Sequence, residues 1–190
     1  LMGDEITRIS FIWMNEKMDE GDIVFQEQIR ILKGEDYFDL SNRLSLRSAE
    51  VLPQFLDRLK LHGVAERVPQ RHEDATYTPI ITKSTGAIDW NRKAIEIDRQ
   101  VRALVAWPTA STTFEGRTVK IFKSSVGRDD EGARPGLICE VGKEGISVGT
   151  GSGLLVIREL QMQDKKRMKA YDFAMGYRGL IGKCFSYISI

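Results

Sequence analysis

The strongest constraint on the fold is a series of short alternating runs, divided by turn residues, that fills the second half of the chain. Turn dipeptides such as Glu115-Gly116 and Glu144-Gly145 divide the runs, and glycine at such points is a strong signal for a break between strands. Five short strands at this spacing predict a small β-barrel. The strands are expected at residues 112–114, 118–123, 137–141, 146–148 and 154–160.

One helix is expected before these strands and a short one after them. Asn91 is a favourable N-cap residue, and the apolar residues that follow it between 95 and 104 recur at helical spacing. Trp107-Pro108 should end this helix, because the residue before proline disfavours the α conformation. The short helix is expected near Ala170–Met175, and a glycine-containing tail closes the chain.

The first part of the chain has a different pattern. Residues 7–14 and 23–31 are rich in β-branched and aromatic side chains and predict two strands joined by a polar loop. From Asp36 apolar residues recur at helical spacing, and Pro53 inside this run is expected to kink the helix or to start a new one. The polar stretch 64–77 is interpreted as an extended linker.

Composition excludes several classes of protein. The apolar share of 42% is typical of a globular chain, and no apolar run is long enough to span a bilayer. Cys139 and Cys184 match no metal or redox spacing. Residues 1–74 hold 10 basic and 15 acidic side chains, whereas residues 75–190 hold 18 and 12. A basic second half is compatible with a polyanion partner, although scattered solvated charge explains it equally well.

Two tracts carry a resemblance to a known family. The first is Met18-Asp19-Glu20-Gly21-Asp22-Ile23-Val24, and the second comprises Ile88-Asp89-Trp90-Asn91, residues 96–103 and Trp107-Pro108. Together they resemble the downstream part of the methionyl-tRNA formyltransferase family. The usual family form of the first tract is Leu-Asp-x-Gly-Asp, and this chain has Met18 in place of the leucine. Without the resemblance, residues 19–22 would be interpreted only as a polar turn.

The resemblance implies a catalytic residue and a formyl donor. In this family the matching aspartate orients a catalytic histidine and helps to manage protons while an amine attacks the formyl group, so Asp19 is the predicted catalytic residue. The donor would be 10-formyltetrahydrofolate. The family's Asn-x-His and its Ser-Leu-Leu-Pro folate segment do not occur here, and His62 and His72 match neither. We therefore expect the 190-residue chain to be inactive alone.

The resemblance also implies two domains and a macromolecular partner. Residues 1–74 would be the end of a doubly wound α/β formyltransferase domain, and residues 75–190 an OB-like β-barrel that binds initiator methionyl-tRNA in the cytoplasm. The first part would lack the strands that complete its core. It should therefore expose apolar surface that pairs with the missing N-terminal fragment or self-associates.

A cluster of basic residues is the predicted tRNA contact. The family has a lysine-rich segment after its last barrel strand, and residues 161–169 resemble it. Clustered basic side chains bind phosphates by releasing counterions, although an ordinary solvated loop is the alternative. The glycine stretch 149–153 precedes a strand, which favours a hairpin turn over a phosphate loop. The predicted contacts are Lys165, Lys166, Arg167 and Lys169, extended by Lys120 and Lys123 on one strand face.

Other functions remain open from the sequence. The chain could be a non-catalytic RNA-binding barrel whose first 74 residues are a relic or a dimerisation element. It could also belong to a formyltransferase that acts on a nucleotide sugar or to a formyl-tetrahydrofolate hydrolase, since other members of the superfamily share the aspartate-containing turn and the Trp-Pro region. The length and the basic loop of the second part favour the tRNA enzyme.

Overall fold

The computed structural model describes residues 1–63, 66–130 and 132–187, and the chain divides into two compact units. Unit 2, as we name it, comprises Asp4–Ile80, and unit 1 comprises Ile81–Ile190 together with Leu1–Gly3. No helix in the described part of the chain is long and apolar enough to cross a membrane.

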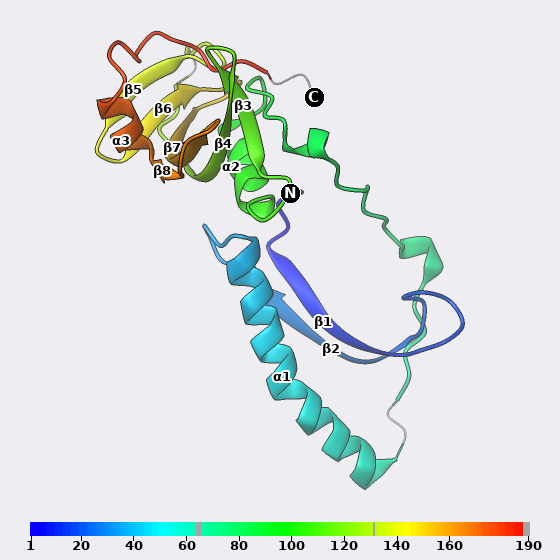
Figure 1. Ribbon diagram of the computed structural model, residues 1–190. Helices are drawn as coiled ribbons and strands as arrows, with labels where there is room; N and C mark the ends of the chain where they lie inside the picture. The colour runs from blue at the N-terminus through cyan, green and yellow to red at the C-terminus, as the bar shows by residue number, and fades with distance from the viewer. Residues whose placement is uncertain (64–65, 131, 188–190) are drawn as a thin grey trace. The chain divides into compact units, whose positions relative to one another are not determined.

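Unit 2 is an antiparallel hairpin with one long helix (Figure 1). Strands β1 (Ile6–Trp13) and β2 (Asp22–Arg30) pair along their whole length. Helix α1 (Tyr37–His62) begins at Asp36, whose side chain accepts hydrogen bonds from the next turn. The helix contains Pro53 without interruption, so the predicted start of a second helix at this residue was wrong.

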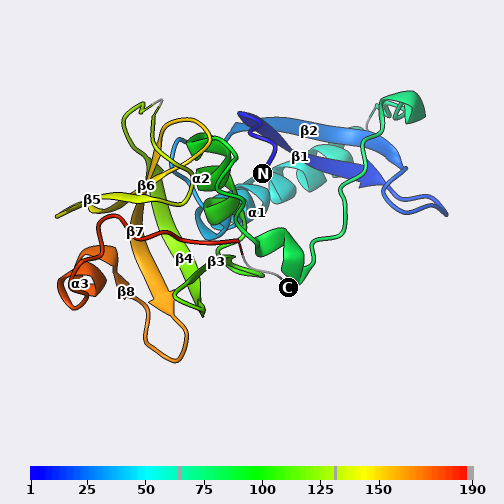
Figure 2. The same ribbon diagram turned by 90° about the horizontal axis from the view of Figure 1, so that it is seen from above.

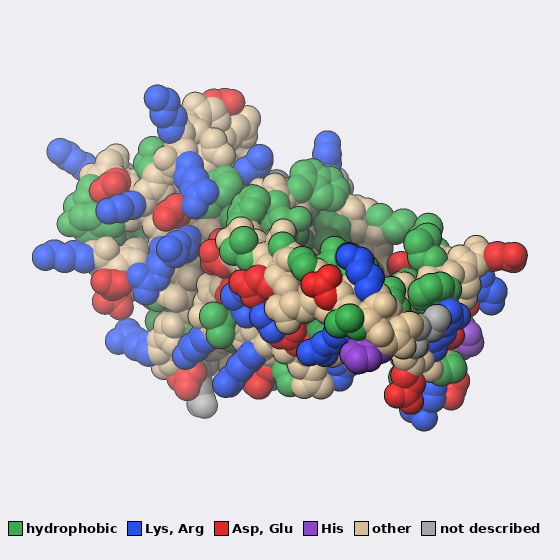
Figure 3. All heavy atoms as spheres, turned by 90° about the horizontal axis from the view of Figure 1, so that it is seen from below, with side chains coloured by type: hydrophobic (Ala, Val, Ile, Leu, Met, Phe, Trp, Pro, Cys, Tyr) green, Lys and Arg blue, Asp and Glu red, His purple; other side chains and the backbone are tan. Residues whose placement is uncertain are grey.

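The hairpin and the helix share few buried side chains. The rings of Phe11 and Phe25 lie 5.0 Å apart, and Phe55 of α1 lies 5.3 Å from Phe11. Among the described residues of unit 2, Ile9 and Val51 are the only buried hydrophobic side chains, and they are still 8% and 5% exposed. Many other hydrophobic side chains of unit 2 are exposed to solvent, including Met14 and Met18, which are 84% and 88% exposed. Hydrophobic side chains, green in Figure 3, are visible at the surface on the face shown there. Unit 2 therefore exposes apolar surface, as the sequence predicted.

Unit 1 is an antiparallel sheet in the strand order β3-β4-β7-β6-β5 (Figure 2). Its strands confirm the five predicted runs and extend most of them by one to three residues: β3 is Ala110–Phe114, β4 Arg117–Val126, β5 Ile138–Gly142, β6 Gly145–Gly149 and β7 Leu154–Met162. The glycine stretch 149–153 forms the predicted turn between β6 and β7. A two-residue strand that was not predicted, β8 (Met168–Lys169), pairs with β7.

Two helices pack against this sheet. Helix α2 (Ala94–Ala103) ends before Trp107-Pro108, as predicted. It begins after Lys93 rather than at Asn91, because the Asn91 amide donates to the side chain of Asp89 while Glu96 accepts from the Lys93 amide. Helix α3 (Ala170–Met175) lies where the sequence predicted it. Asp98 of α2 is buried and accepts hydrogen bonds from Arg102 (2.9 Å) and from Ser124 of β4 (2.8 Å).

The C-terminal segment, residues 183–187, joins the two edges of the sheet. The edge strands β3 and β5 do not pair with each other in the described residues, so the predicted barrel is seen as an open sheet. Ser186 instead exchanges both main-chain hydrogen bonds with Thr113 of β3, and Cys184 is paired with Leu137 at the start of β5. Phe185 is 3% exposed and stacks on Trp90, with ring centroids 5.7 Å apart. The segment thus completes the core between the two edges.

Candidate functional site

Asp19 lies in the loop that joins β1 to β2. Its φ angle is +58°, a left-handed conformation that aspartate tolerates better than most residues. The side chain is exposed, and no hydrogen bond or ion pair holds its carboxylate within the described part of the chain. The main chain of the loop therefore determines where Cβ of Asp19 points, and so the region that its carboxylate can reach.

Gly21 lets this loop pack tightly against the end of β1. A Cβ atom at this position would lie only 2.1 Å from the carbonyl oxygen of Trp13, which no side chain can satisfy without movement of the main chain. The glycine of the Asp-x-Gly pattern is thus required by a close approach of two main-chain segments.

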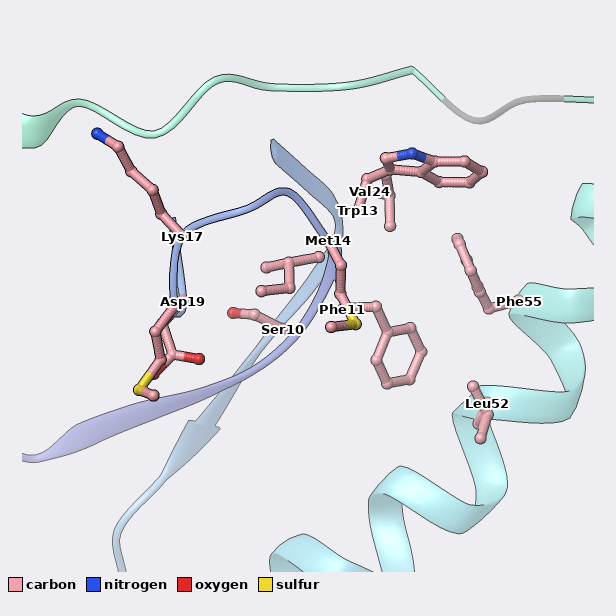
Figure 4. A pocket seen from close by; sticks show the side chains of 11 residues that line it. Ser10, Phe11, Trp13, Met14, Lys17, Asp19, Val24, Leu52 and Phe55 are labelled. Carbon is pink, nitrogen blue, oxygen red and sulfur yellow. The ribbon is translucent and has the colours of Figure 1, made fainter. Parts of the chain in front are cut away.

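The loop borders a hollow of about 590 Å³ (Figure 4). Figure 4 shows Asp19 and Lys17 on one side of it and the rings of Phe11 and Phe55 on the other. Apolar side chains form most of the remaining wall, with Ser10 as a further polar group. Pockets of this size with a few polar groups are typical of small-molecule sites. The arrangement can offer a carboxylate for proton transfer at the border of an apolar surface.

Residues of the predicted linker also contact this loop. Gln70 donates from Nε2 to the main-chain oxygens of Asp19 (2.8 Å) and Gly21 (2.7 Å). Val68 exchanges two main-chain hydrogen bonds with Ile23, both 2.9 Å. None of these contacts could be predicted from the sequence, because the partners lie about 45 to 50 residues apart and glutamine in a polar stretch gives no local signal.

The predicted basic residues gather on unit 1. A register shift between Ile121 and Lys123 forms a bulge in β4. Residues three apart in a regular strand point to opposite faces, but the extra residue lets Lys120 and Lys123 share the exposed face while Ile121 is buried. Lys123 stands opposite Glu159 of β7, and Glu159 stands opposite Lys169 of β8. The bulge thus aligns Lys123 and Lys169 across the sheet.

The remaining basic residues lie in the turn between β7 and β8. Lys165 and Lys166 are exposed and make no ion pair among the described residues. Arg167 differs, because its guanidinium contacts Glu159 at 2.6 Å and lies 4.5 Å from the ring centroid of Phe122. A shallow hollow of about 210 Å³, lined by Lys120 and by residues 161–164, lies between β4 and this turn. Lys120, Lys123, Lys165, Lys166, Arg167 and Lys169 are called the basic cluster below.

The two histidines do not form a site with Asp19. His62 is the last residue of α1, and His72 begins a short 3-10 helix. Nδ1 of His72 lies 3.7 Å from the carboxylate of Glu20. No group of three or more histidine, cysteine, aspartate or glutamate side chains is arranged to hold a metal ion in the described residues.

Comparisons with known proteins place the chain in a family. The family model for the formyl transferase C-terminal domain matches residues 80–178, and that for formyl transferase matches residues 1–56. The chain belongs to the formyl transferase family. Its sequence is 41% identical over 176 residues to methionyl-tRNA formyltransferase of Geobacter metallireducens and 37% identical over 174 residues to that of Alkaliphilus oremlandii. These alignments cover 93% and 92% of the chain and 56% of each relative.

A solved structure shares the fold of this chain. HypX from Aquifex aeolicus, solved in complex with tetrahydrofolic acid, matches 95% of this formyl transferase chain and 32% of its own, with a TM-score of 0.63 and 16% identity. At this identity the match establishes the fold. The chain spans little more than half the length of the curated formyl transferases that it matches.

Proposed function

We propose that this chain is the downstream part of an enzyme that transfers a formyl group from 10-formyltetrahydrofolate to the amino group of initiator methionyl-tRNA. The observation that carries the proposal is the 37–41% identity to methionyl-tRNA formyltransferases over more than nine tenths of the chain. Residues 1–74 are proposed as the end of the catalytic domain. Residues 75–190 are proposed as an OB-type tRNA-binding domain, in which residues 183–187 close the sheet.

Asp19 is the proposed catalytic residue. An uncharged amine must attack the formyl carbonyl and lose a proton. Asp19 offers a carboxylate that has no partner among the described residues and lies beside a largely apolar hollow. The donor would supply the formyl group. This chain would contribute one wall of the site, in which Asp19 holds or orients the group that accepts the proton.

A chimaera tests the enzyme assignment. The upstream part of the Geobacter metallireducens relative is joined to this chain, and formylation of methionyl-tRNA is measured with 10-formyltetrahydrofolate. Asp19→Asn should lower kcat by about 100-fold or more, the usual contribution of a positioned acid or base. Glu16→Gln, a control in the same loop, should change it little. Transfer to a nucleotide sugar but not to methionyl-tRNA would contradict the proposal.

The basic cluster is the proposed tRNA contact. Its five lysines are exposed, lie on one strand face or in one adjoining turn, and have no ion pair in the described part of the chain. Arg167 forms an ion pair with Glu159. Its proposed contribution is therefore to fix the turn between β7 and β8 in place as well as to add positive charge. Such a surface would contact the phosphates of a folded RNA rather than stack on its bases.

Salt dependence tests this contact on the 190-residue chain. In the triple variant Lys165, Lys166, Lys169→Ala the slope of log affinity against log salt should become shallower by about 2.7, because each lost phosphate contact contributes about 0.9. Lys83, Lys93, Lys143→Ala removes the same charge from exposed positions elsewhere in unit 1. Equal slopes in the two triple variants would exclude the basic cluster as the contact.

A further inference from the structure

Gln70 stands out in the polar stretch that follows α1. From residue 66 to residue 84 it is the only side chain that is not exposed. A side-chain amide has two N–H donors, and Nε2 of Gln70 directs them to the main-chain oxygens of Asp19 and Gly21 at 2.8 and 2.7 Å. The two carbonyls flank Glu20, so a single side chain spans the loop that carries the proposed catalytic aspartate.

The neighbours of Gln70 are attached to the same hairpin. Two main-chain hydrogen bonds join Val68 to Ile23 next to the start of β2. The guanidinium of Arg67 lies 4.2 Å above the ring of Trp13 at the end of β1. His72 lies 3.7 Å from Glu20. Segment 67–72 therefore lies alongside the β1–β2 loop and the adjoining strand ends. Within this segment, Gln70 is the residue that contacts the main chain of Asp19.

We propose that Gln70 is a positioning residue for Asp19, an inference that rests on the formyl transfer proposed above. The Asp19 carboxylate has no partner of its own in the described residues, so its direction depends on the main chain at residues 19–21. Gln70 fixes two of the three carbonyls of that segment. Because segment 67–72 is also the start of the connection to unit 1, the catalytic loop is held by the segment that joins the two units.

The first experiment measures how fast the β1–β2 loop opens in the 190-residue chain. Hydrogen exchange of residues 15–21 and tryptic cleavage after Lys17 are compared in wild type, Gln70→Ala and Gln26→Ala. Gln26 is a matched control, because its Nε2 donates to Ser10 on the same hairpin. Loss of two hydrogen bonds should speed opening of the loop by about ten-fold in Gln70→Ala. Equal rates in the two variants would overturn the proposal.

Gln70→Glu separates the hydrogen bonds from the shape of the side chain. Glutamate fills nearly the same space, but its ionised form only accepts hydrogen bonds and would repel the two carbonyls. Protonation near pH 4 restores one donor. Loop exchange, corrected for its intrinsic dependence on pH, should therefore slow as the pH falls in Gln70→Glu and stay fast in Gln70→Ala. An absence of recovery in Gln70→Glu would contradict a donor role.

The chimaera links the loop to catalysis. Gln70→Ala should lower kcat at least ten-fold and change the KM for methionyl-tRNA less than two-fold, whereas Gln26→Ala should leave both unchanged. A fully active Gln70→Ala chimaera would overturn the positioning role. A wild-type chimaera that is inactive, but whose loop is protected from hydrogen exchange and from trypsin, would refute the proposed function. The hydrogen bonds from Gln70 to the loop would still be supported by that result.

Discussion

Phe185→Ala tests whether the C-terminal segment is part of the core of unit 1. Phe185 is 3% exposed, and its ring centroid lies 5.7 Å from that of Trp90 and 5.3 Å from that of Phe114. Truncation of a buried phenylalanine to alanine costs about 3–5 kcal/mol, from lost transfer free energy and from the cavity left behind. The main-chain hydrogen bond from Phe185 to Gly136 (2.8 Å) is retained in this variant, so the change isolates the ring.

Urea unfolding followed by tryptophan fluorescence measures this loss. A Trp13→Phe background removes the one tryptophan of unit 2, so that the signal comes from Trp90 and Trp107 of unit 1. With a denaturant slope near 2 kcal/mol/M, a loss of about 4 kcal/mol lowers the midpoint by about 2 M. Tyr187→Ala is the control, since that side chain is 62% exposed. A free-energy loss below about 1 kcal/mol for Phe185→Ala would refute the role of the segment as a closing element.

Three further predictions concern single interactions. Asp98→Ala should destabilise unit 1 by about 2–3 kcal/mol in urea unfolding, because it leaves the Ser124 hydroxyl without its buried acceptor and removes one ion-pair partner of Arg102; a loss under 0.5 kcal/mol would contradict this. Hydrogen bonds from Lys183 and Tyr177 lower the pKa of Glu115, so this carboxylate stabilises the fold above its unfolded pKa of about 4.3, and the stabilisation is lost as the pH falls. In Glu115→Gln the temperature of half-unfolding should therefore fall less between about pH 5 and pH 3 than it does in wild type. Parallel plots of this temperature against pH for the two proteins would exclude the effect. Gly21→Ala should displace the Asp19 loop, seen as changed amide shifts at residues 13–22, because the new Cβ would meet the Trp13 carbonyl.

Local signals explain which elements of the fold could be predicted. The strands of unit 1 were predicted because alternation and turn residues are encoded in neighbouring positions. The start of α2 was misplaced because Asp89 and Asn91 are both good capping residues, and the side chain of Asp89 accepts from the Asn91 amide in a turn before the helix. The bulge at Phe122 has no local marker, yet it decides that Lys120 and Lys123 share a face.

Long-range contacts explain what the sequence could not provide at the site. Asp19 was predicted from its motif and stays a prediction, and the tight packing of Gly21 accounts for the glycine in that motif. Gln70 was missed because its partners lie 49 and 51 residues away. The ion pair of Arg167 with Glu159 was also hidden, since it depends on the pairing of β7 with β8. A residue such as Gln70, whose partners are distant in the chain, gives a weaker local signal in the sequence than a residue such as Asp19, which belongs to a short motif.

The position of the closing segment also affects how this domain forms during synthesis. The two edges of the sheet are joined by residues 184–186, which follow every strand of unit 1 in the chain. A ribosome delivers these residues after every strand that they connect, and chains fold from the N-terminus as they emerge. Strands β3 to β7 would therefore keep one side of their core open until residues 184–186 have left the ribosome. The closing segment should thus be the last part of unit 1 to join the fold during synthesis.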